Sequence, residues 1–290
     1  LASQIGRRNA EQEFKWMKQE YSVSSGVGSK KFDTATMDAI SNMLKRRISG
    51  EPLQYILGTQ PFGSLCLQVR PPVLIPRPET ENWTLRLSDL IKTEFLQSEY
   101  RRPISLLDLG TGTGCIPLLL CNTLPLGTLR AHGIDVSQDA LALATENAEH
   151  CGFSVTTKEH KAMNNTFIAR KGNILSGDVL HAEFLPPPFD VITSNPPYIP
   201  WGEFLALDRS VCEHEDARAL FGGPDGLEFY EAIERLIAER ELLKQGGILA
   251  LEVGHNQANA VVDLMSKVGL RDVETWRDPW GKSRTVVARG

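Results

Sequence analysis

Apolar positions repeat with a helical period over the first part of the chain. Four of them share one face of a single pattern: Met37, Ile40, Leu44 and Ile48. A spacing of three or four residues is typical of an amphipathic helix that packs on one side. The stretch 22–31 contains several serines and glycines and predicts a flexible connection. We therefore predict a small helical domain over residues 1–58.

The hydrophobic period shortens after residue 58. Apolar residues now occupy nearly alternate positions: Phe62, Leu65, Leu67 and Val69. Alternation of this kind predicts short β-strands, and the proline-rich stretch 71–78 predicts a stiff connection after them. Residues 59–79 are therefore expected to form a β-hairpin linker that lies beside the functional site.

From about residue 80 onward, strand-like apolar runs alternate with helical patterns. This alternation predicts an α/β fold, in which helices cover both faces of a mostly parallel sheet. The expected elements are a helix from Ser137 to about His150, a helix over 226–244 capped by Asp225, a strand over 248–253, and strands over 273–276 and 285–288 joined by a turn at 278–281. Residues 80–290 form the third predicted region.

A glycine-rich loop follows the apolar run 104–107. Its sequence is Asp108-Leu109-Gly110-Thr111-Gly112-Thr113-Gly114. The glycines permit positive φ and a close approach of a ligand to the backbone, and the following helix offers unpaired N–H groups at its start. The spacing G-x-G-x-G differs from the dinucleotide fingerprint and lacks the lysine of a P-loop. The loop therefore predicts a nucleoside ligand without a phosphate chain.

Two further acids follow the next apolar runs. Asp135 lies about 20 residues beyond Gly114, the spacing at which nucleotide-binding folds place the acid that binds the ribose hydroxyls. Asp178 follows the next short apolar stretch. A single acid at a strand end is more often a helix cap or a solvated loop residue. Three acids in order, at three strand ends, favour a shared ligand site.

The tetrad Asn195-Pro196-Pro197-Tyr198 closes the apolar run 190–194. Its prolines remove two backbone donors and stiffen the turn, which leaves carbonyl groups without internal partners. The Asn195 oxygen, the Pro196 carbonyl and the Tyr198 ring suit a planar NH2 group, because its hydrogens need acceptors and its π face can stack. A bare Asn-Pro-Pro is also a common strand-ending turn. Tyr198 and the upstream glycine loop favour the ligand site.

Together these motifs resemble class I S-adenosylmethionine-dependent methyltransferases, and specifically the glutamine methyltransferases of the HemK/PrmC type that modify peptide release factors. Two further segments, residues 50–58 and 74–81, are similar to family-specific stretches. The resemblance implies a Rossmann-like, seven-stranded sheet, S-adenosyl-L-methionine as cofactor, and the glutamine of a release factor Gly-Gly-Gln loop as substrate. The helical domain and the hairpin would grip the release factor.

The resemblance also implies roles for individual residues. Catalysis would involve Asn195, Pro196 and Tyr198. The cofactor would contact Asp108, Gly110, Thr111, Gly112, Thr113, Gly114, Asp135, Asp178, Val179 and Asn195. The substrate would contact Asn195, Pro196, Pro197, Tyr198, Arg77 and Glu79. The chain departs from the family at Val179, where an aromatic residue would flank the adenine, and at Lys158–Lys171, which we interpret as a surface insertion.

Composition narrows the remaining choices. Acidic residues outnumber basic ones 36 to 31, for a net charge of −5, and a duplex-binding enzyme usually carries a basic face. The five cysteines show no metal-ligand spacing, so we expect reduced thiols and no metal site. No apolar run is long enough to span a bilayer. We expect an intracellular soluble monomer, with the mitochondrial matrix slightly favoured because the chain does not begin with Met.

Two other functions use the same motifs. An adenine methyltransferase would place the tetrad against a flipped base, but it would need a basic channel or an added recognition domain. A non-catalytic adaptor would retain the fold only to bind a partner. Intact Asp108, Asp135, the three glycines and the complete tetrad favour an enzyme over the adaptor.

Overall fold

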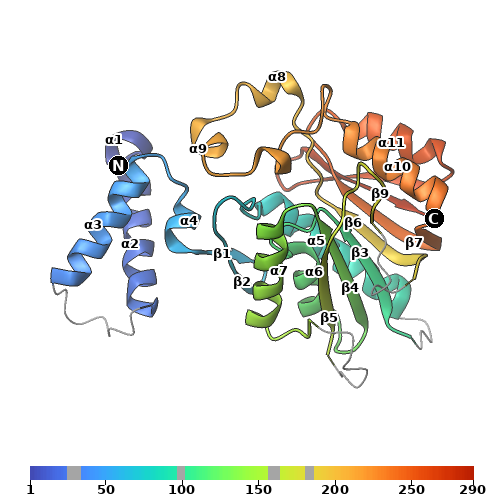
Figure 1. The fold of residues 1–290 in the computed structure, drawn as a ribbon, viewed down its shortest axis with the longest axis horizontal. Coiled ribbons are helices and arrows are strands. Elements are labelled where there is room, and N and C mark those ends of the chain that lie inside the picture. The colour runs from blue at the N-terminus through green and yellow to red at the C-terminus, as the bar shows by residue number, and fades with distance from the viewer. Residues whose placement is uncertain (25–33, 97–101, 156–163, 180–185) are drawn as a thin grey trace.

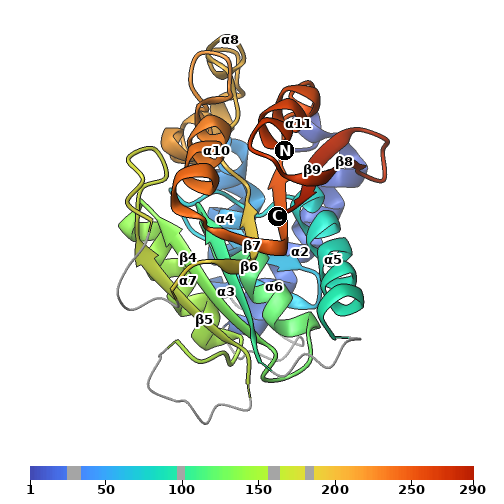
Figure 2. The same cartoon turned by 90° about the vertical axis from the view of Figure 1, so that its right-hand side faces the viewer.

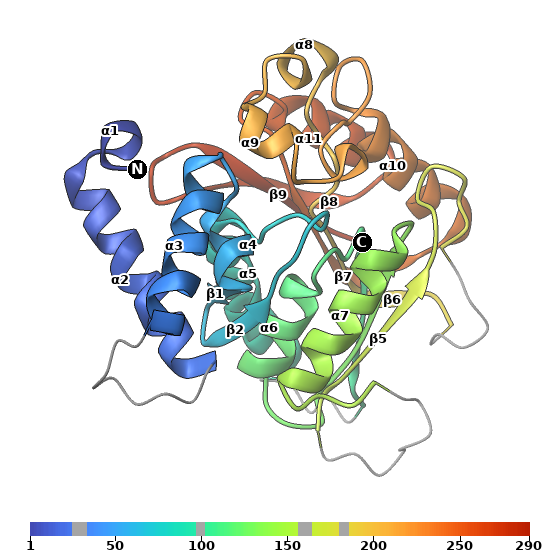
Figure 3. The same ribbon diagram turned by 60° about the vertical axis from the view of Figure 1, so that its left-hand side comes forward.

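The computed structural model describes residues 1–24, 34–96, 102–155, 164–179 and 186–290. Figure 1 shows a group of helices beside a larger α/β body, with a small hairpin between them. The helices and the hairpin are α1 (Ala2–Ile5), α2 (Arg7–Ser24), α3 (Thr34–Ile48), α4 (Leu53–Leu57), β1 (Thr59–Phe62) and β2 (Leu65–Gln68). Figure 3 shows the hairpin next to α4. The chain then enters the α/β body at α5 (Pro78–Ile91).

The α/β body contains a seven-stranded sheet of order β5-β4-β3-β6-β7-β9-β8. Its strands are β3 (Ile104–Leu109), β4 (Leu129–Asp135), β5 (Thr166–Lys171), β6 (Phe189–Ser194), β7 (Leu243–Glu252), β8 (Arg271–Arg277) and β9 (Ser283–Arg289). Strands β3 to β7 pair in parallel, whereas β9 is antiparallel to both neighbours. The strand order reverses between β3 and β6. In open α/β sheets this is the point where ligands bind, beyond the carboxyl ends of the strands.

Helices cover both faces of the sheet because successive strand residues point to opposite sides. On one face, Leu106 and Val191 pack in a cluster with side chains of α5, α6 (Cys115–Thr123) and α7 (Gln138–His150). On the other face, Leu107 and Ile192 pack with α10 (Glu228–Arg240) and α11 (Ala258–Lys267), which lie side by side in Figure 2. The central strands are therefore buried on both sides, and their polar ends meet at one edge.

The remaining elements are short and connect the larger ones. They are a π-helix (Lys92–Leu96), α8 (Trp201–Phe204), α9 (Arg209–Cys212) and a 3-10 turn (Ala217–Ala219). Segment 199–226, which includes α8 and α9, leaves the tetrad and returns to the sheet before α10, as Figure 1 shows. Among the residues that the structure describes, no helix has the length and apolarity that crossing a membrane requires.

Several predicted elements are confirmed. The hairpin pairs Phe62 with Leu65, and the two last strands are present with a turn between them. Helix α7 begins after Ser137, whose side chain accepts a hydrogen bond from the Ala140 N–H. Local capping and turn chemistry were sufficient to predict these features.

Other predictions were wrong at specific positions. The expected insertion 158–171 ends in strand β5, where Phe167 and Ile168 are buried in the sheet, and residues 156–163 lie outside the described part of the chain. Charged neighbours had masked this short strand. Helix α10 ends at Arg240, and β7 already begins at Leu243, so the predicted boundary was several residues late.

The predicted face of α3 is only partly buried. Ile40 is 3% exposed, but Met37 and Ile48 are 54% and 47% exposed. Among the described elements, helix α3 packs mostly against α2 and α4, and these neighbours leave part of its apolar face uncovered. The predicted flexible stretch 22–31 begins inside α2, and its part from residue 25 onward lies outside the described residues.

Candidate active site

A cavity of about 590 Å³ opens at the carboxyl ends of β3, β4 and β6, at the reversal of strand order. Five of the residues predicted from sequence line it: Gly110, Gly112, Asp135, Asn195 and Pro197. They come from three separate strand ends, which the parallel sheet brings to one edge. The cavity therefore combines the glycine loop, Asp135 and the tetrad in one site.

The glycine loop is tied to the end of β4. The Gly110 and Thr111 N–H groups both donate to the Ile134 carbonyl, at 2.9 and 2.8 Å. Gly114 has φ 78° where α6 begins, and a Cβ there would crowd Leu118 at 3.2 Å. A side chain at this position would therefore meet both a strained backbone and the packed helix. The loop is held as a rigid wall of the cavity.

Asp135 joins the glycine loop to α7. Its Oδ2 accepts from the Gly112 N–H and its Oδ1 accepts from the Ser137 N–H, both at 2.9 Å. Burial raises the pKa of this carboxyl, and the two backbone donors oppose that shift. Each carboxylate oxygen retains a further acceptor site. The group can therefore shape the loop and still accept hydrogen bonds from a diol in the cavity.

Asp108 is buried in β3 directly before the loop and does not line the cavity. Its Oδ1 accepts a hydrogen bond from the Thr193 hydroxyl at 2.7 Å, and its Oδ2 has no hydrogen-bond partner among the described residues. Burial raises its pKa to about 6. The Thr193 and Thr111 hydroxyls oppose that shift, and the carboxyl adds negative charge behind the glycine loop.

The tetrad lies at the end of β6. Asn195 is partly buried, and its Nδ2 donates to the Thr80 hydroxyl oxygen at 3.2 Å. The Tyr198 carbonyl accepts from Gln257 Nε2 at 2.8 Å. The half-buried Tyr198 ring packs beside the core formed with α10 and α11, and burial raises the pKa of the Tyr198 phenol. Asn195 and Pro197 thus line the cavity, while Pro196 and Tyr198 do not.

A buried network behind Asn195 was not predicted. The Thr80 hydroxyl donates to Glu252 Oε2 at 2.6 Å, and the Trp83 indole N–H donates to the same oxygen at 2.8 Å. Glu252 is 1% exposed, and burial raises its pKa. Thr80 belongs to the family-specific segment 74–81, which was the one available signal in the sequence for its involvement.

Arg77 and Glu79 are both occupied by protein groups and do not line the cavity. Arg77 Nη2 donates to both carboxylate oxygens of Glu215, at 2.8 and 2.7 Å. Glu79 Oε1 lies 3.8 Å from Arg284 Nη2. The predicted substrate contacts of both residues therefore stay a hypothesis.

Asp178 and Val179 do not line the cavity either. Val179 is fully buried in the apolar cluster with α10, and the Asp178 carbonyl accepts from the Asn173 N–H at 2.7 Å. The wall at this place comes from the preceding turn, residues 173–175. The predicted adenine contact of Val179 thus falls in the core, and the nearby cavity residues are Ile174 and Leu175.

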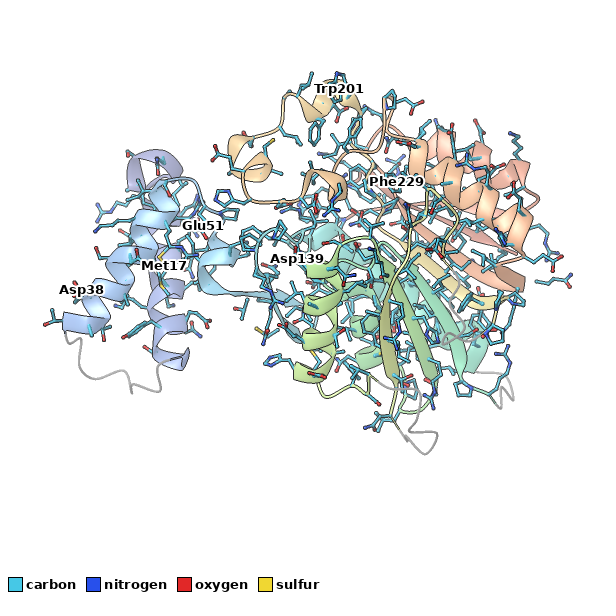
Figure 4. The ribbon with its side chains drawn as sticks, viewed as in Figure 1. Met17, Asp38, Glu51, Asp139, Trp201 and Phe229 are labelled. Carbon is cyan, nitrogen blue, oxygen red and sulfur yellow. The ribbon has the colours of Figure 1, made fainter. Side chains whose placement is uncertain are left out.

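Further cavity residues come from segments without a recognisable motif. The linker contributes Pro72, Val73 and Leu74, and the chain after α9 contributes Asp216, Ala217, Arg218, Ala219 and Phe221. The Asp216 N–H donates to the Pro72 carbonyl at 2.8 Å, which holds these two segments together. Figure 4 labels Phe229, which lines the cavity from α10, and Trp201, which lies on α8. Their placement depends on the fold and could not be predicted locally.

No group of three or more histidine, cysteine, aspartate or glutamate side chains that could hold a metal ion occurs in the part of the chain that the structure describes.

The sheet order, the glycine loop after β3 and Asp135 at the end of β4 define a class I methyltransferase. A crystal structure of a methyltransferase from Pyrococcus furiosus shares the fold, with a TM-score of 0.51 and 17% identity, covering 86% of this chain and 98% of that chain.

Sequence relatives identify the family more closely. The release factor glutamine methyltransferase of Geobacter sulfurreducens is 37% identical, over 98% of this chain and 91% of that protein. The enzyme of the same name from Gloeobacter violaceus is 39% identical, over 87% of this chain and 80% of that protein. A family model described as the PrmC N-terminal domain matches residues 27–58. The chain belongs to the release factor glutamine methyltransferase family, which confirms the expected enzyme class and the cofactor, S-adenosyl-L-methionine.

Proposed function

We propose that this chain transfers a methyl group from S-adenosyl-L-methionine to the side-chain amide nitrogen of the glutamine in the Gly-Gly-Gln motif of a peptide chain release factor. The observation that carries this proposal is the position of Asn195. Its carboxamide lines the same cavity as the glycine loop and Asp135, and its NH2 group is held by Thr80. In this proposal, Asn195 Oδ1 is the acceptor that a substrate amide would meet beside the cofactor.

The residues around the cavity fit the cofactor. Gly110 and Gly112 leave room for a close approach to the backbone, since a Cβ at Gly112 would meet no atom within 4 Å and one at Gly110 would meet only Ile174, at 3.9 Å. Asp135 would accept hydrogen bonds from the ribose hydroxyls, and the unpartnered Asp108 oxygen provides negative charge behind the loop. When bound, the cofactor supplies a methyl group on a positively charged sulfur. Thr111, Thr113 and Gly114 would shape this loop.

The protein contributes chiefly by positioning the substrate nitrogen. A carboxamide nitrogen is a poor nucleophile because its lone pair is delocalised into the carbonyl group. Asn195 Oδ1 and the Pro196 carbonyl would accept its two hydrogens, and no described residue donates a hydrogen bond to either oxygen. Two acceptors orient the nitrogen and favour the pyramidal geometry that develops during transfer. No strong base is needed beforehand, because the nitrogen becomes acidic only after methylation.

Tyr198 and Pro197 complete the proposed substrate contacts. Pro197 lines the cavity, and the half-buried Tyr198 ring would pack over the substrate amide from the tetrad. Substrate contacts of Pro196, Tyr198, Arg77 and Glu79, and cofactor contacts of Asp178 and Val179, remain part of the proposal without support from the cavity geometry.

The test is transfer of a labelled methyl group from S-adenosylmethionine to a purified release factor. The same factor with its loop glutamine changed to alanine and a duplex DNA serve as parallel substrates. Label on the wild-type factor alone supports the proposal. Label on DNA would move the function to an adenine methyltransferase, and no label on either, with no heat of cofactor binding, would favour a non-catalytic adaptor.

Asn195→Ala separates the proposed roles within the site. We expect turnover to fall about 100-fold or more, the size of effect seen when one polar group that positions a transition state is removed. Cofactor affinity should change far less, since the glycine loop and Asp135 remain. Intact turnover with lost cofactor binding would contradict the assignment.

The family supports a release factor as partner, but it leaves the oligomeric state and the compartment open to experiment. The release factor is the expected partner, and a monomer without sequence-specific nucleic-acid binding stays a prediction that light scattering and gel-shift assays can test. The relatives compared above are bacterial, and so they give no support to the mitochondrial matrix.

A further inference from the structure

Asn195 is the last member of a buried hydrogen-bonded chain. Trp83 and Thr80 both donate to Glu252 Oε2, at 2.8 and 2.6 Å, and Asn195 Nδ2 donates to the Thr80 oxygen at 3.2 Å. Thr80, Trp83 and Glu252 are each at most 2% exposed. These hydrogen bonds join the start of α5, the end of β7 and the tetrad after β6.

The direction of each hydrogen bond in this network follows from which groups can donate and which can accept. An indole N–H can only donate, so Trp83 requires Glu252 Oε2 to be an acceptor. A threonine hydroxyl has one hydrogen, which Thr80 gives to the same oxygen. The Thr80 oxygen can then only accept, and the neighbouring Asn195 group must be the NH2 and not the carbonyl. Asn195 Oδ1 is thereby directed away from Thr80.

We propose that Glu252 and Thr80 are positioning residues that fix the amide of Asn195 in one orientation, so that its oxygen faces the substrate and selects a nitrogen that carries hydrogens. This inference rests on the proposed function. In the reversed orientation Asn195 would present NH2 to the substrate NH2, where two donors would face each other, and the site would favour a carbonyl or carboxylate instead. The network therefore distinguishes glutamine from glutamate at the target position.

The experiment compares two variants of Thr80 that differ in one group. Thr80→Ser keeps the hydroxyl and should retain turnover within about 3-fold, whereas Thr80→Val keeps the shape and removes the hydroxyl. With Val, Asn195 loses its acceptor and the constraint on its orientation, so kcat should fall about 10- to 100-fold, the range expected when a partner of a buried polar group is lost. The dissociation constant for S-adenosylmethionine, measured by calorimetry, should stay within about 3-fold.

Glu252→Met tests the other end of the network. Methionine removes the acceptor that Thr80 and Trp83 share, so the Thr80 hydroxyl is free to donate to Asn195 and to reverse its amide. We expect a loss of kcat similar to that of Thr80→Val, again with little change in cofactor affinity.

Thr84→Val is the matched control. Thr84 is fully buried one turn further along α5, and its hydroxyl donates to the Thr80 backbone carbonyl at 2.7 Å without touching the network side chains. Its loss should lower thermal stability about as much as Thr80→Val does and leave kcat unchanged. A merely structural role of Thr80 would make the two variants alike in both measurements.

The outcomes separate this inference from the proposed function. Methylation of the release factor by the wild type, with kcat lost in Thr80→Val and kept in Thr80→Ser and Thr84→Val, supports it. Wild-type kcat in Thr80→Val, or an equal loss in Thr84→Val, overturns the positioning role and leaves the proposed function intact. Absence of methylation by a folded wild type that binds the cofactor overturns both. If Glu252→Met does not fold, the Thr80 pair alone decides.

Discussion

Arg77 forms an ion pair with the buried carboxylate of Glu215, 138 positions away in the sequence. Glu215 has a side chain only 1% exposed, and burial raises its pKa while Arg77 opposes that shift. The pair connects the linker before α5 to the segment that lines the cavity through Asp216 and Ala217. It therefore holds two walls of the site together.

Arg77→Met should lower the free energy of unfolding by roughly 2 kcal/mol, because it leaves a buried carboxyl without its partner. Adding Glu215→Gln should then cost less than it costs in the wild type, with a coupling of about 1 kcal/mol. Urea denaturation measures both. The control is Arg70→Met in the Arg70–Glu146 pair, whose side chains are 43% and 46% exposed and whose loss should cost less than about 1 kcal/mol. Equal losses for Arg70 and Arg77 would contradict a special role of the buried pair.

Asp108→Asn should change how stability depends on pH. Burial raises the pKa of Asp108 from 3.8 to about 6, so the folded state binds the proton more tightly than the unfolded chain. The stability that this proton contributes is complete below about pH 4 and is lost as pH rises through 6. The unfolding free energy of Asp108→Asn minus that of the wild type should therefore rise by roughly 2 to 3 kcal/mol between pH 4 and pH 7.

Denaturation at several pH values tests the Asp108 prediction. The control is Asp263→Asn, which removes a carboxylate at an exposed position on α11. The same pH dependence in both variants, or none for Asp108→Asn, would contradict the prediction.

Asp135→Asn should weaken cofactor binding about 10-fold or more. The two carboxylate oxygens accept from Gly112 and Ser137, and an asparagine has only one acceptor oxygen for these two donors. The loop position and the ribose contact should both suffer. Calorimetry with S-adenosylmethionine gives the dissociation constant.

The control for Asp135 is Asp139→Asn, which removes the same charge from an exposed position in the first turn of α7. Figure 4 labels Asp139. Its effect should be under about 3-fold, because an exposed charge at a helix end contributes well under 1 kcal/mol in salt. An equal loss in both variants would mean that net charge, and not the Asp135 contacts, determines affinity.

Gly226→Ala should lower turnover, because a Cβ at this position would collide with the Tyr198 carbonyl and Gln257 Nε2. These two groups hydrogen-bond to each other behind the tetrad. Displacing them would shift Pro197 and Asn195, and we expect turnover to fall about 10-fold or more, since small displacements at a reacting centre are costly.

Gly246→Ala separates the collision from the backbone effect. Both glycines have positive φ, 81° for Gly226 and 73° for Gly246, but a Cβ at Gly246 meets nothing within 4 Å. Both variants should lose about 1 kcal/mol of stability through backbone strain. Only Gly226→Ala should lose methyl transfer, and unchanged turnover in that variant would refute the packing role.

Local chemistry explains which parts of the site were predictable. Gly110, Asp135 and Asn195 each follow an apolar strand, and parallel strands place their carboxyl ends at one edge of the sheet. Position in sequence was therefore enough to place these residues at one site. Val179 was expected at the cofactor from the family resemblance alone. It lies beyond the turn after β5 and is buried in the apolar cluster, so its cofactor contact stays a prediction.

Periodicity failed where it was short or interrupted. Strand β5 is six residues long and ends in Ala169-Arg170-Lys171, so its charged end concealed Phe167 and Ile168, which the sheet buries. Only pairing with β4 makes this segment a strand. The exposed face of α3 shows the converse, because an apolar pattern stays exposed when no neighbour is available to cover it.

The sequence by itself determined the α/β class and the positions of the glycine loop, Asp135 and the tetrad along the chain, because each depends on residues adjacent in the chain. The tertiary structure alone decided how Asn195 is oriented. Thr80 and Glu252 lie 115 and 57 positions from it in the sequence. Their hydrogen bonds exist only because folding buries α5 against the ends of β6 and β7. Direction and burial of a side chain are properties of that packing, which no local pattern encodes.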